Sequence, residues 1–282
     1  MINIKKIQRD KPIGELLKFA IINIDKPTGP TSFTVSDFVR RSLGLNKTSH
    51  FGTLDPTVSG VLPVALGRAC RLNEYFMHKN KTYVGIMRLH SDVEEKKLKE
   101  EIKKFIGKII QTPPVKSRVK RAPREREVKS FEILEIEGKD VLFSTEVEAG
   151  TYIRKLCDDI GKQIGGAHML ELRRIKAGIF SEENSINLYD FESAFREYME
   201  GKEENLRKIL IPGEIIYEVL PVVKLKSGNM EKILTGKPLM KEDIGKLPEF
   251  ERFALFRKET FLGCYKKVSE GEIIAKAEFV FN

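Results

Sequence analysis

One carboxylate stands out among the residues that could carry chemistry. Asp55 lies in HFGTLDPTVSG (50–60), a stretch rich in Gly, Thr, Ser and Pro in which it is the only acidic residue. A lone aspartate can act as a nucleophile, because its carboxylate can form a covalent intermediate with a substrate. Asp followed by Pro is also typical of a helix start, where the Asp oxygen accepts a hydrogen bond from a free amide. The stretch alone leaves both interpretations open.

A cation follows in EAGTYIRKL (148–156), where a strand is expected to end and a helix to begin. Gly150 interrupts the alternating pattern of the preceding strand, and the residues from Thr151 predict a helix. Arg154 then falls in the first helical turn, where the helix dipole makes a positive charge slightly unfavourable. Its position beside a strand end therefore indicates a functional side chain.

A third candidate feature is a basic stretch, KSRVKRAPREREVK (116–129), which holds seven basic and two acidic residues. Pro123 and the lack of a wide apolar stripe predict a loop or an edge ribbon rather than a helix. The stretch could be a solvated turn or a surface that contacts phosphates. The candidates for phosphate contacts are Lys116, Arg118, Lys120 and Arg121.

The strands that must position these side chains follow from apolar patterning. They are expected at 20–24, 81–90 and 141–147, the last with Val141, Phe143, Thr145 and Val147 on one face.

Three helices are predicted between these strands. The first follows the Pro-rich turn at 26–30, with Thr31 or Ser32 as its cap and Gly44 as its end. The second opens with a capping box of Ser91 and Glu94, and the third is the helix of Arg154. Their inward positions are Val35, Phe38, Val39 and Leu43; Leu98, Ile102 and Ile106; and Ile153, Leu156, Cys157, Ile160 and Ile164.

Composition narrows the class of protein. The chain of 282 residues is longer than one average domain and carries a net charge of +9, which favours a polyanionic partner. The three cysteines are far apart and the four histidines form no HExxH motif, so neither a disulfide framework nor a metal clamp is expected. No stretch predicts a signal peptide or a membrane span, so we expect a cytoplasmic protein that does not bind membranes.

The sequence pattern changes after Pro212. Residues 217–282 contain short β-prone runs separated by Gly and Glu, which predict a small all-β domain. We therefore expect an N-terminal segment (1–19), a main domain (20–213) and this small domain (217–282).

Six motifs occur in a familiar order: INIDKPTGPTS, HFGTLDPTVSGVLPV, KTYVG, TPPVKSRVKR, EAGTYIRKL and GAHMLELRRIKAG. Together they resemble the TruB/dyskerin family of RNA pseudouridine synthases, and ELLKFAIINIDKP is closest to the archaeal H/ACA ribonucleoprotein branch. The resemblance implies an α/β (α+β type) catalytic domain with a mixed, largely antiparallel sheet, followed by a small all-β PUA RNA-binding domain against which the N-terminal segment packs.

The resemblance also implies roles for individual residues. Asp55 matches the nucleophile, which needs neither a metal nor a cofactor, and Arg154 the cation that holds it. Tyr83 matches the tyrosine that stacks on the target base, although it could be a core aromatic residue. His50 matches a histidine that wedges against RNA, or it is a hydrogen-bonded structural histidine.

Three further residues are expected near the site. Leu172 matches an apolar residue beside the base, although any buried leucine would look the same. Lys26 is expected to support the catalytic loop, and Tyr152 to form part of the pocket wall.

The implied function is isomerisation of uridine to pseudouridine in RNA, with ribosomal RNA targets chosen by an H/ACA guide RNA and with small H/ACA proteins as partners. One alternative is the same chemistry without a guide, on the T-loop uridine of transfer RNA. The other, from a different class, is an RNA-binding scaffold without catalysis.

Overall fold

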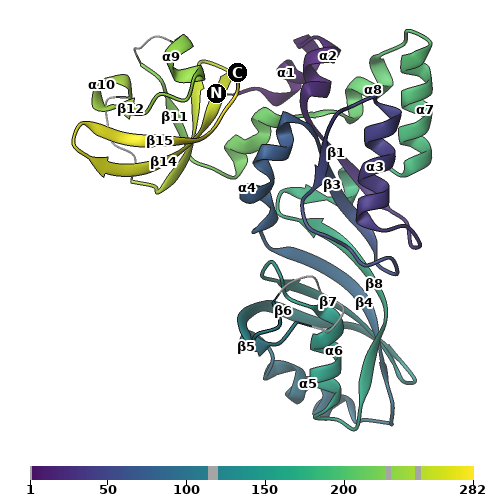
Figure 1. Cartoon of the computed structure of the whole chain (residues 1–282). Coiled ribbons are helices and arrows are strands. Elements are labelled where there is room, and N and C mark those ends of the chain that lie inside the picture. The colour runs from purple at the N-terminus through teal and green to yellow at the C-terminus, as the bar shows by residue number, and fades with distance from the viewer. Residues whose placement is uncertain (1, 114–119, 227–229, 245–248) are drawn as a thin grey trace.

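Two β-sheets organise the chain. The computed structural model describes residues 2–113, 120–226, 230–244 and 249–282. Ten strands form the larger sheet and five form the smaller one, which lies to one side of it (Figure 1). The strands of the larger sheet are β1 (Phe19–Lys26), β2 (Thr48–His50), β3 (Ser59–Gly67), β4 (Lys81–Leu89), β5 (Gly107–Gln111), β6 (Arg124–Glu137), β7 (Asp140–Val147), β8 (Ala167–Ala177), β9 (Phe180–Ser181) and β10 (Ile211–Pro212).

The larger sheet has the order β10-β1-β3-β8-β4-β7-β6-β5, with β2 paired to β3 and β9 to β8. Its named strand pairs are antiparallel except β3 with β8, as far as the structure describes the chain. The expectation of a mixed, largely antiparallel sheet in an α/β protein is therefore confirmed.

The smaller sheet has the order β11-β13-β14-β15-β12. Its strands are β11 (Val222–Lys224), β12 (Leu239–Met240), β13 (Arg252–Arg257), β14 (Thr260–Glu270) and β15 (Ile273–Val280). Two short helices, α9 (Met230–Leu234) and α10 (Lys241–Ile244), accompany it, so this part of the chain is not purely β.

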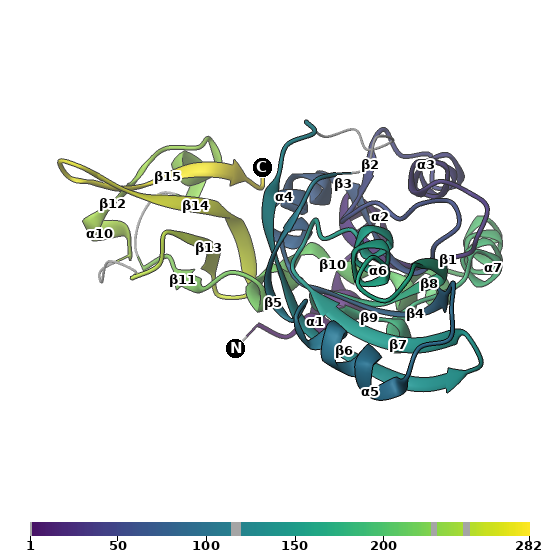
Figure 2. The same cartoon turned by 90° about the horizontal axis from the view of Figure 1, so that it is seen from below.

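Helices and the larger sheet share one apolar core. Buried residues of α3, α5, α6, α7 and α8 pack with those of the strands, and α6 lies beside β8 (Figure 2). The helices of this part are α1 (Ile4–Asp10), α2 (Ile13–Lys18), α3 (Ser32–Ser42), α4 (Asn73–Met77), α5 (Glu95–Lys103), α6 (Ile153–Gly161), α7 (Leu188–Met199) and α8 (Glu204–Ile209), with 3₁₀ turns at Arg68–Leu72, Glu182–Asn184 and Gly213–Glu218.

A second apolar core joins the two sheets. Phe19, at the start of β1, has its ring centroid 5.4 Å from that of Phe261 on β14 and 4.4 Å from that of Phe281. Ile2 packs against the same cluster, and Lys6 forms an ion pair with Glu259 of the smaller sheet. The first residues of the chain therefore contact both parts of the molecule.

Several predicted elements are confirmed. The strands expected at 20–24, 81–90 and 141–147 correspond to β1, β4 and β7, although β4 ends one residue earlier, at Leu89, and the four inward positions of β7 are buried. Thr31 caps α3 by accepting a hydrogen bond from the amide of Thr34.

The capping box predicted at Ser91 and Glu94 is wrong. α5 begins at Glu95, its cap Glu94 makes no side-chain capping bond, and the Ser91 hydroxyl donates to the Ile164 carbonyl at 3.4 Å. Ile106 also lies beyond the helix and is 42% exposed, because Gly107 (φ +100°) turns the chain into β5. Ile106 continues the apolar spacing of the helix, although the helix itself ends at Lys103.

The basic stretch is only partly a loop or an edge. Residues 120–123 have no regular structure, whereas 124–129 form the first part of β6, which lies between β5 and β7. Lys116 and Arg118 fall outside the described residues. No helix of the described chain is long and apolar enough to cross a membrane.

Candidate active site

Asp55 lies on the loop that joins β2 to β3. The Val58 amide donates to the Asp55 carbonyl at 3.0 Å, and the loop then enters β3 without forming a helix. Asp55 is therefore not a helix cap, and its carboxylate is left for other contacts. The side chain is 55% exposed, so a substrate can reach it.

The backbone beside Asp55 is tied to helix α3. The buried Ser32 hydroxyl accepts from the Leu54 amide at 2.8 Å and donates to the Leu54 carbonyl at 2.9 Å. The sequence suggested Ser32 only as an alternative helix cap. The sequence carried no signal for its role, because Thr31 and Ser32 were equal candidates for the cap and only the structure shows that Thr31 is the cap.

Lys26 holds the other side of the same loop. Its buried ammonium group donates to the carbonyls of Pro27 at 2.7 Å, Pro30 at 2.9 Å and Pro56 at 3.4 Å. Burial lowers the Lys26 pKa, although the charge of Asp55 acts in the opposite direction. Through the Pro56 carbonyl, Lys26 supports the backbone directly after Asp55.

Arg154 forms an ion pair with Asp55 across the site. It occupies the first turn of α6, where the sequence predicted it, and its guanidinium donates to the carboxylate. Both side chains are about half exposed, so solvent screens the attraction and the pair contributes little to stability. The arrangement orients the carboxylate toward the guanidinium group.

The start of α6 is fixed by a buried glutamine that the sequence did not single out. Gln111, at the end of β5, accepts from the Tyr152 amide at 3.0 Å and donates to the Tyr152 carbonyl at 3.3 Å. Tyr152 is the N-cap of α6, so this contact also positions Arg154 two residues later.

Tyr83 and Leu172 lie on the paired strands β4 and β8. Both are nearly buried, at 9% and 8% exposure, and both belong to the main core. Gly85, opposite Leu172, leaves room for it, because a Cβ there would lie 2.8 Å from Leu172 Cδ1. The Tyr83 ring therefore packs in the apolar core, which also includes Leu54 of the Asp55 loop.

Arg174 is a further residue of the site that the sequence analysis missed. It is opposite Tyr83 in the β4–β8 register, is 1% exposed and interacts with the Tyr83 hydroxyl. A signal was present in the consecutive pair Arg173-Arg174, because neighbouring residues of a strand point to opposite faces and one of the two must face the core.

His50 ends β2 at the edge of the loop. Its Nε2 lies 3.3 Å from Thr53 Oγ1 and its Nδ1 3.5 Å from Ser36 Oγ. Burial and the positive charge of Arg174 lower the His50 pKa, so the ring is neutral at pH 7. The ring forms one wall of a pocket of about 380 Å³, which Phe33 and Asn73 also line.

Lys120 and Arg121 are exposed on the segment before β6. Their charges are available to a polyanion. Among the described residues no cluster of three or more His, Cys, Asp or Glu side chains could hold a metal ion.

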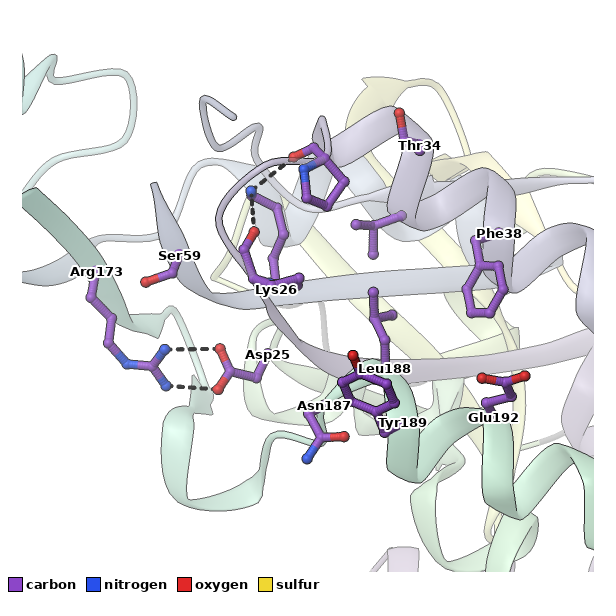
Figure 3. Close-up of a pocket in the computed structure, with 13 residues that line it drawn as sticks. Asp25, Lys26, Thr34, Phe38, Ser59, Arg173, Asn187, Leu188, Tyr189 and Glu192 are labelled. Carbon is purple, nitrogen blue, oxygen red and sulfur yellow. Dashed lines mark hydrogen bonds and ion pairs between the residues drawn. The ribbon is translucent and has the colours of Figure 1, made fainter. Parts of the chain in front are cut away.

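A larger pocket, of about 510 Å³, lies on the flank of the loop (Figure 3). Asp25 and Arg173 form a two-fold hydrogen-bonded ion pair at its edge, with both N–O distances 2.9 Å, and Phe38, Leu188 and Tyr189 line its far side. Lys26 is the predicted site residue that lines this pocket, whereas Asp55, Tyr83 and Arg154 do not.

Comparison with known proteins shows which family this chain belongs to. Residues 40–153 match the N-terminal domain of the TruB family of pseudouridylate synthases, and residues 154–217 match the C-terminal domain of tRNA pseudouridylate synthase B. The probable tRNA pseudouridine synthase B of Methanopyrus kandleri is 46% identical over 232 residues, which cover 82% of this chain and 69% of the relative. That of Methanocaldococcus jannaschii is 40% identical over 275 residues, covering 97% and 80%.

Solved structures give the same result. The chain superposes on a chain of a Cbf5-Nop10-Gar1 complex with a TM-score of 0.89 at 40% identity, covering 98% of this chain and 88% of the other. A chain of an H/ACA ribonucleoprotein bound to substrate RNA that contains 2′-deoxyuridine gives a TM-score of 0.87 at 39% identity, covering 98% and 89%. The chain therefore belongs to the TruB family and is an RNA pseudouridine synthase.

Proposed function

We propose that Asp55 is the nucleophile of this pseudouridine synthase and that Arg154 holds its carboxylate in place. The observation that carries the proposal is the Asp55–Arg154 ion pair, formed on a loop that Ser32 and Lys26 fix from two sides. A fixed, ionised and accessible carboxylate is what an attack on a sugar carbon requires.

In the reaction the bond between C1′ and N1 of uridine breaks, the base turns, and a bond forms between C1′ and C5. N1 gains a proton and C5 loses one, so the reaction is an isomerisation. Asp55 serves either by attacking C1′ or by promoting a glycal intermediate. Tyr83 and Leu172 hold the base by stacking and apolar contact, Tyr152 lies at the pocket wall, and His50 contacts the RNA beside the target.

Substrate choice is the second part of the proposal. The structures similar to this chain include an H/ACA ribonucleoprotein and a complex of Cbf5 with Nop10 and Gar1, which supports guide-directed action together with such small proteins. The relatives named as probable tRNA pseudouridine synthase B support guide-independent action on transfer RNA. We favour the guided reaction on ribosomal RNA in the cytoplasm and keep the transfer RNA reaction as the alternative.

The domain division belongs to the same proposal. Residues 20–213 form the catalytic domain and 217–282 a PUA-type RNA-binding domain, against which residues 1–19 pack. The support is the pairing of Lys6 with Glu259 and the contact of Ile2 with the cluster around Phe261. The Lys11 ammonium pairs with Glu214 at 2.7 Å and lies 5.5 Å from the centre of the Phe281 ring.

One assay tests both parts. The purified chain is incubated with transfer RNA, and separately with a guide RNA annealed to its target, with and without the small H/ACA proteins. Asp55→Asn and Asp55→Ala are expected to abolish product on any substrate that the wild type modifies, while RNA affinity stays within about threefold. The matched control is Asp140→Asn, because Asp140 also pairs with an arginine, Arg88, at an exposed position.

Turnover by an Asp55 variant would contradict the nucleophile assignment. Product on transfer RNA alone would favour the guide-independent reaction. RNA binding without product on either substrate, including by the wild type, would favour the scaffold alternative.

A further inference from the structure

The pocket of about 380 Å³ beside His50, which we call the His50 pocket, lies between helices α3 and α4. Its lining includes Phe33, Ser36 and Arg40 of α3, His50 of β2, Thr53 of the Asp55 loop and Asn73 of α4. Thr53 is two residues before Asp55, so the pocket adjoins the loop that carries the carboxylate. Pockets of this size bind small molecules or single groups of a larger ligand.

Phe33 is an aromatic side chain with no ring partner in the part of the chain that the structure describes. It lies in the first turn of α3, is 71% exposed and is in none of the three apolar clusters of the described residues. The next phenylalanine of the same helix, Phe38, packs on Phe191 with ring centroids 5.9 Å apart. Single exposed apolar side chains are common, so exposure alone assigns no role. Phe33 differs in lining a pocket, where a flat ring can stack on a nucleic-acid base.

Asn73 supplies an amide group without a hydrogen-bond partner to the α4 side of the pocket. Its Oδ1 is buried and accepts no hydrogen bond from the described residues. A buried oxygen without a partner costs free energy, and an asparagine amide can donate and accept at the same time. The edge of a nucleic-acid base also places a donor beside an acceptor. A base edge would therefore satisfy Asn73.

Hydrogen bonds hold the wall that α3 and β2 form. The Thr48 hydroxyl donates to the Ser36 carbonyl at 2.8 Å, and the Ser36 hydroxyl donates to the Phe33 carbonyl at 3.0 Å. Nδ1 of His50 lies 3.5 Å from Ser36 Oγ on the same wall. The pocket is thus formed before a ligand arrives, so little order has to be gained on binding.

The charges around the pocket favour an anion. Arg40 and Arg41 share one carboxylate, Asp37, with N–O distances of 2.8 Å and 2.7 Å, so these three side chains together carry one positive charge. Lys47 is exposed just before β2 and adds another cation. A ligand that combines a flat base with a phosphate matches the ring, the amide and the charge together, and such a ligand is a nucleotide.

We propose that the His50 pocket binds an unpaired nucleotide of the RNA next to the target uridine, with its base stacked on Phe33 and its edge hydrogen-bonded to Asn73. The proposal rests on the proposed function, which places the target uridine at Asp55 and the RNA against His50. Because the pocket adjoins the Asp55 loop, the nucleotide next to the target is the one that enters it. The base must be unpaired, since a base in a duplex cannot also stack in a protein pocket.

The affinity of the full chain for RNA tests the stacking contact. The probes are transfer RNA, and target RNA annealed to its guide together with the small H/ACA proteins. In each probe the base on either side of the target uridine is removed in turn, which leaves an abasic sugar. Phe33→Ala is expected to bind intact RNA about tenfold more weakly than the wild type does. On RNA that lacks the base at one of the two positions, the same substitution is expected to cost less than about twofold.

Tyr189→Ala is the matched control, because Tyr189 is an exposed aromatic residue that does not line the His50 pocket. It should bind intact and abasic RNA as the wild type does. Thermal unfolding of each variant is recorded alongside the titrations.

The identity of the neighbouring base tests the amide contact. The wild type is expected to prefer one of the four bases at this position by about fivefold or more, because the Asn73 amide matches some base edges better than others. Asn73→Ala should reduce this preference to within about twofold. Phe33→Ala should lower the affinity for all four bases alike, since every base has a face that can stack.

Equal losses by Phe33→Ala on intact RNA and on both abasic RNAs would overturn the proposal, because the ring would then act without touching the base. Wild-type affinity of Phe33→Ala for intact RNA, or an unchanged base preference of Asn73→Ala, would overturn it as well. These titrations need no turnover, so they are independent of the nucleophile. Product formation by Asp55→Asn would contradict the proposed function and leave the measured contacts of the pocket as they are.

Discussion

At the scale of single residues, the ion pair between Arg154 and Asp55 is a matter of geometry more than of stability. Exposed pairs contribute about 0–1 kcal/mol to folding, so the main effect of this pair is on the direction of the carboxylate. A guanidinium is a planar fork that fixes the direction of its partner, whereas an ammonium is a point charge.

Arg154→Lys is therefore expected to lower kcat by about ten- to a hundredfold, which is about 1.4–2.7 kcal/mol in transition-state energy, and to leave the melting temperature nearly unchanged. Single-turnover rates and thermal unfolding measure the two effects. The control is Arg88→Lys, an equivalent exchange in the exposed pair with Asp140, which should change neither quantity. A wild-type rate for Arg154→Lys would remove this arginine from the site.

At the scale of elements, Lys81 links strand β4 to helix α4 behind the site. It is 5% exposed, and its ammonium group donates to the carbonyls of Met77 and Lys79, at the end of α4 and just beyond it. Burial and the charge of Arg174 lower the Lys81 pKa from 10.5 to about 8. Between these two values the unfolded chain holds the proton that the native chain has lost, so stability rises with pH there.

The free energy of unfolding of the wild type, measured against that of Lys81→Met, should therefore increase from pH 8 to pH 10.5, by about 3 kcal/mol at most. Denaturant titrations at pH 7, 8, 9 and 10 measure the difference. Lys139→Met, at an exposed position, is the control and should show no such change. A difference that is constant with pH would contradict the explanation.

At the scale of the whole molecule, RNA has to reach a half-exposed carboxylate across a surface of mixed charge. The described part of the basic stretch offers Lys120 and Arg121, both exposed. The smaller sheet lies to one side of the larger sheet (Figure 1) and is joined to it through the cluster around Phe19. We expect the basic segment to contact phosphates near the site and residues 217–282 to bind a more distant part of the RNA.

Replacing both Lys120 and Arg121 by Gln should reduce the slope of log affinity against log salt by about two units, and equally for guide RNA and unrelated RNA, because phosphate contacts carry no sequence information. Binding titrations at several salt concentrations provide the slopes. Arg88→Gln, which removes a charge already paired with Asp140, should leave the slope nearly unaltered. An unchanged slope in the double variant would exclude these two residues from the RNA surface.

Local sequence patterns were enough to predict several strands and helices of this protein. Alternation in 141–147 predicted β7 and its buried face, and the position of Arg154 after Gly150 predicted its place in the first turn of α6, because strand alternation and helix starts depend on residues near in sequence. The order of six motifs indicated the family, which the comparisons show. The prediction of a capping box at Ser91 was wrong because a serine hydroxyl can form a hydrogen bond with a group distant in sequence. In this protein the Ser91 hydroxyl donates to the Ile164 carbonyl.

Only the tertiary structure decided which distant residues meet. Asp55 could have been a helix cap until the loop was seen to enter β3 and to face Arg154, 99 residues later in the chain. Ser32, Gln111 and Arg174 form hydrogen bonds with Leu54, Tyr152 and Gly52, and no spacing within the sequence predicts such pairs. The physical reason is that these hydrogen bonds depend on sheet register and helix packing, which are set by burial over the whole chain and not by any single segment.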